Sequence, residues 1–259
     1  MIAQQSELRL SLVVAALNEE RVIEKTVREI VAVTDGRFAD YEIILVDDGS
    51  TDSTGAIMER LATELPQLKV IHHPTNIGLG AAYRRGVVEA RFEYLMMLCG
   101  DGGLPAASLP AIYDAIGTAD IVLPYMRNLK RIKTPLRYAL SRTYTTLLNL
   151  LFWQNIRYYN GLPIHRIEYL RRIAITSTGF GFQGEILTKL LKSGCTYVEV
   201  GVDGAELTQN SQALRIKSVI NVSRTLMRLI LEIWTFDARG VKVPAVEIAG
   251  ISTKRERHT

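Results

Sequence analysis

The chain is 259 residues long, and 47% of its residues are hydrophobic while 22% are charged. That composition is typical of a folded globular protein and excludes a disordered or fibrous chain. The length predicts one α/β domain with an appended element. The cysteines are Cys99 and Cys195 alone, which excludes a disulfide framework and favours a reducing compartment. We expect no secretory signal, because Glu7 and Arg9 precede the first apolar run.

Positive charge is concentrated in the middle of the chain. Residues 121–167, called the basic stretch below, contain no Asp or Glu. Their basic residues are Arg127, Lys130, Arg131, Lys133, Arg137, Arg142, Arg157 and Arg166. Since the whole chain carries +4, the basic stretch carries +8 and the remainder −4. Like charges repel unless an anion offsets them, so the basic stretch predicts an anionic partner: phosphate, nucleic acid or a membrane surface.

In the first half of the chain, apolar runs alternate with segments of helical periodicity. We predict strands at residues 8–16, 41–46, 68–72, 94–98 and 121–123. We predict helices between them, at residues 18–33, 51–65, 83–90 and 109–116. Strands separated by helices in this way are typical of βαβ units, so the sequence predicts an α/β fold with a largely parallel sheet.

Two segments of the second half are predicted to lie at an interface. Residues 127–156 form a basic helical insert that ends in leucine and aromatic residues. Residues 218–236 are long enough to span a bilayer, but their three charges, spaced by four, share one helix face. We therefore expect a main domain over residues 1–210. Residues 211–259 would form an amphipathic helix that lies on a membrane, followed by a basic tail.

Polar residues and glycines follow four of the predicted strands. In chain order they are Asn18 and Glu19; Asp47, Asp48 and Ser50; Asn76, Gly78 and Gly80; and Asp101, Gly102 and Gly103. Each group by itself also fits a helix cap or a tight turn. Because the carboxyl ends of parallel strands meet at one edge of a sheet, the four groups together predict a nucleotide site with a carboxylate for a divalent ion.

Three of these groups resemble the opening motifs of family 2 glycosyltransferases. Residues 17–20 read Leu-Asn-Glu-Glu, residues 46–54 read Val-Asp-Asp-Gly-Ser-Thr-Asp-Ser-Thr, and residues 76–82 read Asn-Ile-Gly-Leu-Gly-Ala-Ala. Their order is most similar to dolichol-phosphate mannose synthases and related polyprenyl-phosphate glycosyltransferases, and the resemblance extends from about residue 10 to residue 201. It implies a three-layer α/β/α sheet of the nucleotide-diphospho-sugar transferase type. It also implies an inverting transfer from a nucleotide-diphosphate sugar to a polyprenyl phosphate.

The resemblance further implies roles for individual residues. The paired aspartates of residues 46–54 would contact the base and the ribose, and Asp101 would be the catalytic carboxylate that binds Mg²⁺ or Mn²⁺. Arg127, Arg137 and Ser141 would hold the acceptor phosphate, in agreement with the basic stretch. The full set implied for the nucleotide sugar is Ala15, Asn18, Glu19, Asp47, Asp48, Ser50, Asn76, Gly78, Gly80, Gln183 and Glu185.

The sequence departs from the family pattern at three places. Cys99 stands where the family has the first aspartate of its Asp-x-Asp metal motif, and a neutral thiol does not replace a hard oxygen ligand. Arg157 stands where an acidic residue is expected. The family's Arg-x-x-Gly-x-Ser loop is reduced to residues 208–213, so Arg215 or Lys217 would have to contact the diphosphate.

The acceptor decides whether the reaction needs a base. A phosphate is already an anion at neutral pH, so the protein has only to align it with the donor and offset the charge of the leaving diphosphate. A sugar hydroxyl would need a general base, for which Glu185 is the candidate. The alternative is that Glu185 is a buried carboxylate satisfied by a partner within the protein.

Other interpretations of the basic stretch and of Cys99 stay open. Five tyrosines lie among the arginines, as in surfaces that bind nucleic acid, although the adjacent residues 147–153 favour lipid. Cys99 is also compatible with a non-catalytic subunit, and the basic residues with packing on acidic neighbours. We expect that the protein does not bind nucleic acid. We expect it to lie peripherally on the cytoplasmic face of a membrane. A membrane subunit or a second copy of the chain would be a further partner.

Overall fold

The computed structural model describes residues 7–179 and 181–205, together with Met227 and Leu231. Two predictions lie outside these residues: the amphipathic helix at 218–236, of which only the two isolated positions are described, and the domain boundary near residue 210. The loop at residues 208–213 lies outside them as well. These features stay predictions.

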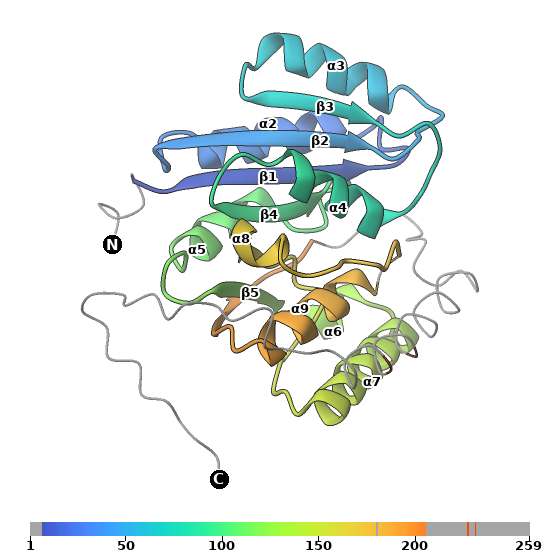
Figure 1. Cartoon of the computed structure of the whole chain (residues 1–259). Coiled ribbons are helices and arrows are strands. Elements are labelled where there is room, and N and C mark those ends of the chain that lie inside the picture. The colour runs from blue at the N-terminus through green and yellow to red at the C-terminus, as the bar shows by residue number, and fades with distance from the viewer. Residues whose placement is uncertain (1–6, 180, 206–226, 228–230, 232–259) are drawn as a thin grey trace.

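In the described part of the chain, seven strands form one sheet with the order β3-β2-β1-β4-β6-β5-β7 (Figure 1). The strands are β1 (Arg9–Ala16), β2 (Asp40–Asp47), β3 (Leu68–His72), β4 (Tyr94–Cys99), β5 (Ile121–Met126), β6 (Ile164–Arg166) and β7 (Tyr197–Val202). Neighbouring strands are parallel except that β6 runs antiparallel to both β4 and β5. The five predicted strands are confirmed, whereas β6 and β7 were not predicted as strands.

Helices connect the strands and cover both faces of the sheet. They are α2 (Ile23–Thr34), α3 (Thr54–Glu64), α4 (Leu79–Glu89), α5 (Leu109–Tyr113), α6 (Leu129–Ile132), α7 (Pro135–Phe152), α8 (Ile167–Leu170) and α9 (Phe182–Lys192), with a short 3-10 helix η1 (Ala106–Ser108). The helix predicted at 18–33 begins later, because Asn18 has a φ of 57° and the chain turns before α2. The predicted insert is two helices, since Thr134 accepts a hydrogen bond from Arg137 N and Pro135 opens α7.

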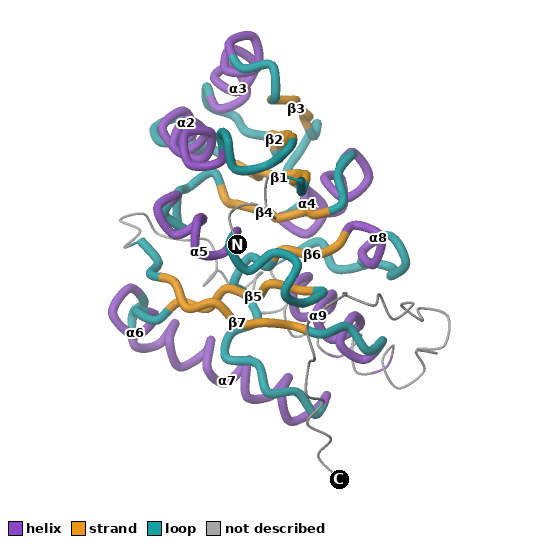
Figure 2. Tube along the Cα trace, turned by 90° about the vertical axis from the view of Figure 1, so that its left-hand side faces the viewer, coloured by secondary structure: helices purple, strands orange, loops and turns teal. Residues whose placement is uncertain are grey.

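Two hydrophobic cores lie on opposite faces of the sheet, which gives the predicted three-layer α/β/α fold (Figure 2). The alternation of β1 explains this, because successive side chains of a strand point to opposite faces. Val13 belongs to the core that also contains residues of α4, α7 and α9. Leu12 and Val14 belong to the core that also contains residues of α2, α3 and α5.

Helix α7 is buried on one side and exposes leucines on the other. Thr145, Leu148 and Phe152 are its buried residues. The exposed leucines, called the α7 stripe below, are Leu136, Leu140, Leu147 and Leu150, with exposed fractions of 62%, 46%, 36% and 71%. Trp153 follows the helix and is 93% exposed. Within the described residues, no helix combines the length and the apolarity that crossing a bilayer requires.

Candidate active site

The carboxyl ends of β1 and β2 are fastened to each other by side-chain hydrogen bonds. The backbone N–H of Asn18 donates to Ser50 Oγ over 3.0 Å, and Asn18 Oδ1 accepts from Thr51 N over 2.8 Å. Asn18 adopts the left-handed backbone conformation that asparagine tolerates better than most residues. Asn18 and Ser50, both predicted to bind the nucleotide sugar, are therefore brought together at the predicted edge.

Asp47 anchors the turn that follows β2. It is buried, its Oδ1 accepts from Ser50 N over 2.9 Å, and its Oδ2 is 2.9 Å from His72 Nδ1 on β3. Burial alone would raise the pKa of Asp47, but hydrogen bonds from Ser50 and His72 outweigh it and hold the pKa below the usual value. Asp47 is therefore an ionised carboxylate that fixes the turn.

Asp48 joins the same turn to the loop before α4. Its carboxylate lies 2.8 Å from His73 Nδ1 and accepts from the backbone N–H of Ile77 and of Gly78, over 3.1 and 2.8 Å. Gly49 makes the approach of the two segments close, because a Cβ there would lie 2.4 Å from the carbonyl carbon of Thr75. Asp48 is 5% exposed and is engaged by donors of the protein itself. Its predicted contact with the ribose stays a prediction.

The glycines after β3 allow another segment to pack closely on the loop. A Cβ at Gly78 would lie 2.4 Å from Thr178 O, and one at Gly80 would lie 2.3 Å from Ser177 O. Gly80 N also donates to Thr178 O over 2.8 Å. Both glycines thus receive residues 177–178, while Asn76 is exposed on the loop.

Glu185 holds that packing segment in place. Its carboxylate accepts from Thr176 N and Ser177 N, over 2.9 and 2.8 Å, and pairs with Lys189 Nζ over 2.7 Å. The side chains of Glu185 and Lys189 are 2% and 3% exposed. Burial would raise the pKa of Glu185, but Lys189 and the two backbone donors outweigh it and lower the pKa. These contacts agree with the alternative that Glu185 is a buried carboxylate satisfied by a partner within the protein. A role for Glu185 toward the donor stays a prediction.

Gln183, two residues before Glu185 on α9, has a buried side-chain oxygen without a hydrogen-bond partner among the described residues. The residue is 5% exposed. A buried carbonyl oxygen without a donor is unfavourable unless a ligand or water supplies one. This observation supports the prediction that Gln183 contacts the donor, because a sugar or ribose hydroxyl would satisfy the oxygen.

The end of β4 is pressed against β1. Gly100 N donates to Ala15 O over 2.8 Å, and a Cβ at Gly100 would lie 2.7 Å from Ala16 Cβ. Asp101 follows directly and is half-buried, with Oδ1 accepting from Gly103 N over 2.9 Å. Ala15, predicted to support the nucleotide through its backbone, thus positions the strand that carries Asp101.

Negative charge accumulates where β1 and β4 end. Burial raises the pKa of Glu19 to about 7, and the charges of Asp101 and Asp52 act in the same direction. Burial also raises the pKa of Asp101 above the usual value. The pKa of the Cys99 thiol is raised by burial and by the carboxylates of Asp101 and Glu19, so Cys99 is a neutral thiol. A cation would offset this charge.

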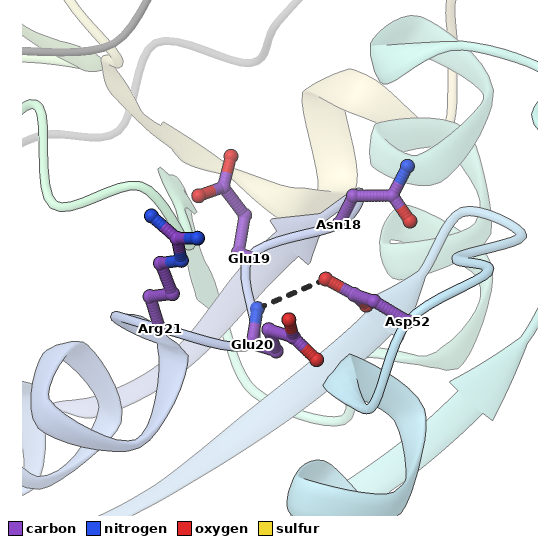
Figure 3. A pocket seen from close by; sticks show the side chains of 5 residues that line it. All are labelled: Asn18, Glu19, Glu20, Arg21 and Asp52. Atoms are coloured by element: carbon purple, nitrogen blue, oxygen red, sulfur yellow. Dashed lines mark hydrogen bonds between the residues drawn. The ribbon is translucent and has the colours of Figure 1, made fainter.

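A polar pocket opens beside these carboxylates. Its volume is about 290 Å³, and it is lined by Asn18, Glu19, Glu20, Arg21 and Asp52. Figure 3 shows that the pocket lies between the loop after β1 and the turn after β2, where Glu20 N donates to Asp52 over 3.3 Å. The sequence marked Asn18 and Glu19 as site residues. Glu20 belongs to the same motif but was not marked, and Arg21 lies just outside it.

Few side chains at the predicted site could bind a metal ion. No three His, Cys, Asp or Glu residues in the described part of the chain are grouped so that they could hold a metal ion. The predicted position offers one carboxylate, Asp101, next to the neutral thiol of Cys99. Mg²⁺ is commonly bound by one or two carboxylates together with substrate phosphates. The residues therefore fit an ion that is shared with a diphosphate.

A cationic group lies on the other side of β4. Lys133, between α6 and α7, donates from Nζ to Ser141 Oγ and to Tyr158 OH, over 3.2 and 3.1 Å. Burial and the charge of Arg137 lower the pKa of Lys133 to about 8. Burial raises the pKa of Tyr158 to about 12; a hydrogen bond with Ser141 and the charge of Arg137 lower this pKa, and the electrostatic interaction with Cys99 raises it. We call Lys133, Ser141 and Tyr158 the Lys133 cluster.

Of the three residues predicted to hold the acceptor phosphate, two lie together. Arg137 and Ser141 are one turn apart on α7; Ser141 belongs to the Lys133 cluster, and the charge of Arg137 acts on Lys133. Arg127 instead pairs with Asp203 over 3.3 Å at an exposed site. Lys133 and Tyr158 were missed, because they are 25 residues apart and no periodicity connects them. Their one signal was membership of the basic stretch.

The fold and the site together define a class. The fold has three layers, a sheet with helices on both faces, and the strand ends carry aspartates, glycines and a polar pocket. This is the architecture of nucleotide-sugar-dependent glycosyltransferases of the GT-A fold. A family model described as glycosyl transferase family 2 matches residues 11–177, and the chain belongs to this family. The resemblance inferred from the motifs is thereby confirmed, and the chain is a glycosyltransferase.

Relatives and solved structures agree with this assignment. An undecaprenyl-phosphate mannosyltransferase of Micrococcus luteus is 29% identical over 214 residues, which cover 76% of this chain and 88% of the relative. A dolichyl-phosphate beta-glucosyltransferase of Trichomonas vaginalis is 30% identical over 245 residues, covering 89% and 75%. A glucosyl-3-phosphoglycerate synthase from Mycobacterium tuberculosis, solved with Mn²⁺, UDP-glucose and phosphoglyceric acid, has a TM-score of 0.67 at 20% identity. That match covers 88% of this chain and 82% of the synthase, and it shows the fold alone.

Proposed function

We propose that the protein transfers a sugar, with inversion, from a nucleotide-diphosphate sugar to a polyprenyl phosphate. The observation that carries this proposal is the Lys133 cluster, in which Lys133 Nζ donates to Ser141 Oγ and Tyr158 OH close to Arg137. Tyr158 of this cluster interacts electrostatically with Cys99, the last residue of β4, and Asp101 follows that strand. Groups that bind a phosphate thus adjoin the edge where the donor is expected. The names of the two relatives, which include undecaprenyl phosphate and dolichyl phosphate, support the same acceptor.

The chemistry needs alignment rather than a protein base. An oxygen of the acceptor phosphate attacks the anomeric carbon from the face opposite the leaving group. The bond from that carbon to the donor diphosphate breaks, and its electron pair leaves with the nucleoside diphosphate. No proton has to be removed, because the phosphate is already ionised. Arg137 and Ser141 would orient the acceptor, and the ends of β1, β2 and β4 would hold the donor.

The leaving diphosphate carries charge that has to be offset. Mg²⁺ or Mn²⁺, held by Asp101 and the diphosphate itself, would supply this electrostatic stabilisation when bound. Cys99 leaves Asp101 as the one carboxylate of the motif, and we infer that the ion is bound together with the donor. The raised pKa values of Glu19 and Asp101 support this, since burial disfavours both charged carboxylates, Asp101 adds to the effect at Glu19, and a nearby cation would favour the charged forms.

The acceptor is a membrane lipid, so we place the protein peripherally on the cytoplasmic face of a membrane. The α7 stripe and Trp153 expose apolar side chains along one helix face, within the basic stretch. Basic residues attract anionic headgroups and aromatic residues favour the interface. A membrane subunit or a second copy of the chain would be the alternative cover for the same face.

A second candidate is transfer to a soluble phosphate ester. The contacts of the Lys133 cluster would suit any phosphate, and the structural neighbour was solved with phosphoglyceric acid. A sugar-hydroxyl acceptor is less favoured, because Glu185, the candidate base, is engaged by Lys189 and two backbone donors. A non-catalytic role rests on Cys99 alone. Activity that appears only in Cys99→Asp would support that role.

One experiment separates these candidates. The purified protein is incubated with UDP-, GDP- or dTDP-sugars, with undecaprenyl phosphate in detergent micelles or with 3-phosphoglycerate, and with or without Mn²⁺. We expect a glycosylated lipid phosphate and an equal amount of nucleoside diphosphate. Product from 3-phosphoglycerate alone would favour the soluble acceptor. Release of nucleoside diphosphate without any glycosylated phosphate would contradict both.

A further inference from the structure

Lys133 joins two segments of the basic stretch through its side chain. It ends α6, and its ammonium group reaches Ser141 on α7 and Tyr158 beyond α7. The ammonium also lies 5.1 Å from the centre of the Tyr158 ring. A lysine has three N–H donors, and these two hydroxyl groups take two of them. One donor therefore stays available in a group that is already fixed in position.

The charge of Lys133 is not balanced by the described residues. Its hydrogen-bond partners are hydroxyl groups, and no carboxylate in the described part of the chain forms an ion pair with it. Lys133 is half-buried and the nearby Arg137 repels it. A partly buried ammonium without an anion is unfavourable, and the lowered pKa reports that cost. An anion bound at this place would remove it.

The position of Lys133 makes one anion the natural occupant. Ser141 and Arg137 are the α7 residues expected to orient the acceptor phosphate, and Ser141 accepts a hydrogen bond from Lys133 Nζ over 3.2 Å. A phosphate oxygen placed there would meet a cation, a hydroxyl and a guanidinium. Charge-assisted hydrogen bonds from several groups bind an anion more strongly than one charge does.

We propose that Lys133 binds the phosphate of the acceptor directly, through its remaining N–H donor, and that with Tyr158 it sets where this phosphate lies relative to the donor. The inference rests on the proposed function, which supplies the acceptor, but it adds a residue that none of the family motifs contains. Lys133 is then a binding residue for the phosphate group, whatever chain the phosphate carries.

Calorimetric titration with geranyl phosphate, a short isoprenyl monophosphate, tests this directly in the full-length protein. We expect Lys133→Met to weaken binding about tenfold or more, since a hydrogen bond to a charged group is lost. Lys133→Gln can still donate to Ser141 and Tyr158, and we expect it to weaken binding as much as Lys133→Met. Lys130→Met is the matched control: an exposed lysine on α6, three residues away, whose removal should leave binding unchanged.

The outcomes separate this inference from the proposed function. UDP and GDP titrations should give the same affinities in all variants, which shows that each is folded. If wild type and Lys133→Met bind geranyl phosphate equally, the role of Lys133 is refuted while the proposed function stands. Normal binding in Lys133→Gln alone would also refute it, because the lysine would then only position hydroxyl groups. If wild type binds 3-phosphoglycerate but not geranyl phosphate, and Lys133→Met loses that binding, Lys133 is a phosphate ligand and the polyprenyl acceptor is wrong.

Discussion

Two regions differ in how their charges are satisfied: the turn after β2 together with α9, and the region of α6 and α7. Asp47, Asp48 and Glu185 are met by donors of the protein, from backbone N–H groups, histidines and Lys189. Lys133 is met by hydroxyl groups and, among the described residues, by no carboxylate. The carboxylates of Asp47, Asp48 and Glu185 are therefore satisfied without a ligand, whereas Lys133 lacks an anion. Under the proposed function, the difference indicates that the donor region is made rigid by the protein's own contacts, whereas the acceptor region gains a missing charge from its ligand.

The largest effect is expected at the end of β4. Asp101→Asn removes the carboxylate charge and keeps the size of the side chain, so we expect turnover to fall by about 10²–10³-fold or more, as when one stabilising group of a transition state is lost. Any Mn²⁺-dependent stabilisation by nucleotide sugar should disappear. Thermal unfolding without ligand should change little. Near-normal turnover of this variant would show that Asp101 is not the metal-binding carboxylate.

Removing a charge from the completed region should cost stability. Glu185→Gln leaves Lys189 as a buried cation without its partner, so the free energy of unfolding should fall by about 3–5 kcal/mol. Chemical denaturation measures this. Glu168→Gln, which removes an exposed carboxylate on α8, is the control and should have a small effect. An equal loss of the free energy of unfolding in the two variants would show that Glu185 stabilises the fold no more than an exposed carboxylate does.

Asp48 tests whether the turn and the loop before α4 act as a unit. Asp48→Ala leaves the N–H groups of Ile77 and Gly78 without their acceptor. We expect binding of the nucleoside diphosphate to weaken by about 1.5–3 kcal/mol, because a hydrogen-bonding carboxylate that orders the loop is lost. Calorimetry measures the affinity and differential scanning calorimetry the stability. An unchanged affinity with lowered stability would restrict Asp48 to holding the turn.

The α7 stripe allows a test on lipid vesicles. Leu150→Gln replaces a leucine that is 71% exposed, so it should not disturb the core. We expect its partition onto vesicles with anionic lipid to fall about tenfold, the scale of one leucine removed from an apolar contact. Co-sedimentation measures this at low and at high salt. Val88→Gln, an equally exposed apolar position on α4, is the control. Equal partition of both variants and wild type would point to a protein partner for the stripe.

The smallest effect concerns pH. Lys133 has its pKa lowered to about 8, so its positive charge is present below that pH and is lost as the pH rises through it. Tyr158, whose pKa is raised to about 12, stays neutral over this pH range. Binding of geranyl phosphate should therefore weaken severalfold between about pH 7.5 and 9.5. In the complex the pKa of Lys133 should be higher than in the free protein, because the bound anion stabilises its positive charge. Lys133→Met should show no such weakening.

Much of the fold could be predicted because local patterns determine it. The first five strands are continuous apolar runs, and the helices between them follow their periodicity. Strand β6 was missed, since three residues carry no period. Helix α2 starts at Ile23 and not at 18, because the left-handed conformation of Asn18 comes from its contacts with Ser50 and Thr51. Such contacts are set by the tertiary structure and leave no local signal.

The candidate site was predictable where motifs carry it. The aspartates and glycines of the strand ends were marked by position and by resemblance. What they do was less accessible: Gly78 and Gly80 receive residues 177–178, nearly a hundred residues later, and this packing cannot be read from the loop itself. The contact between Lys133, before α7, and Tyr158, after it, could not be predicted for the same reason. Glu185 and Lys189 are the exception, because their spacing of four on one helix indicates an ion pair.

Strand β6 also determines the order in which this molecule can assemble. Strands β1 to β4 pair with each other and are complete once about a hundred residues have been synthesised, but the outer edge of β4 is unpaired until residues 164–166 arrive. Only then can β5 and β7 join, because β6 lies between them and β4. A nascent chain would thus form a nucleotide-binding half early and expose one open edge for some sixty residues of synthesis. A chaperone or an early misfolding event would meet the chain at this edge.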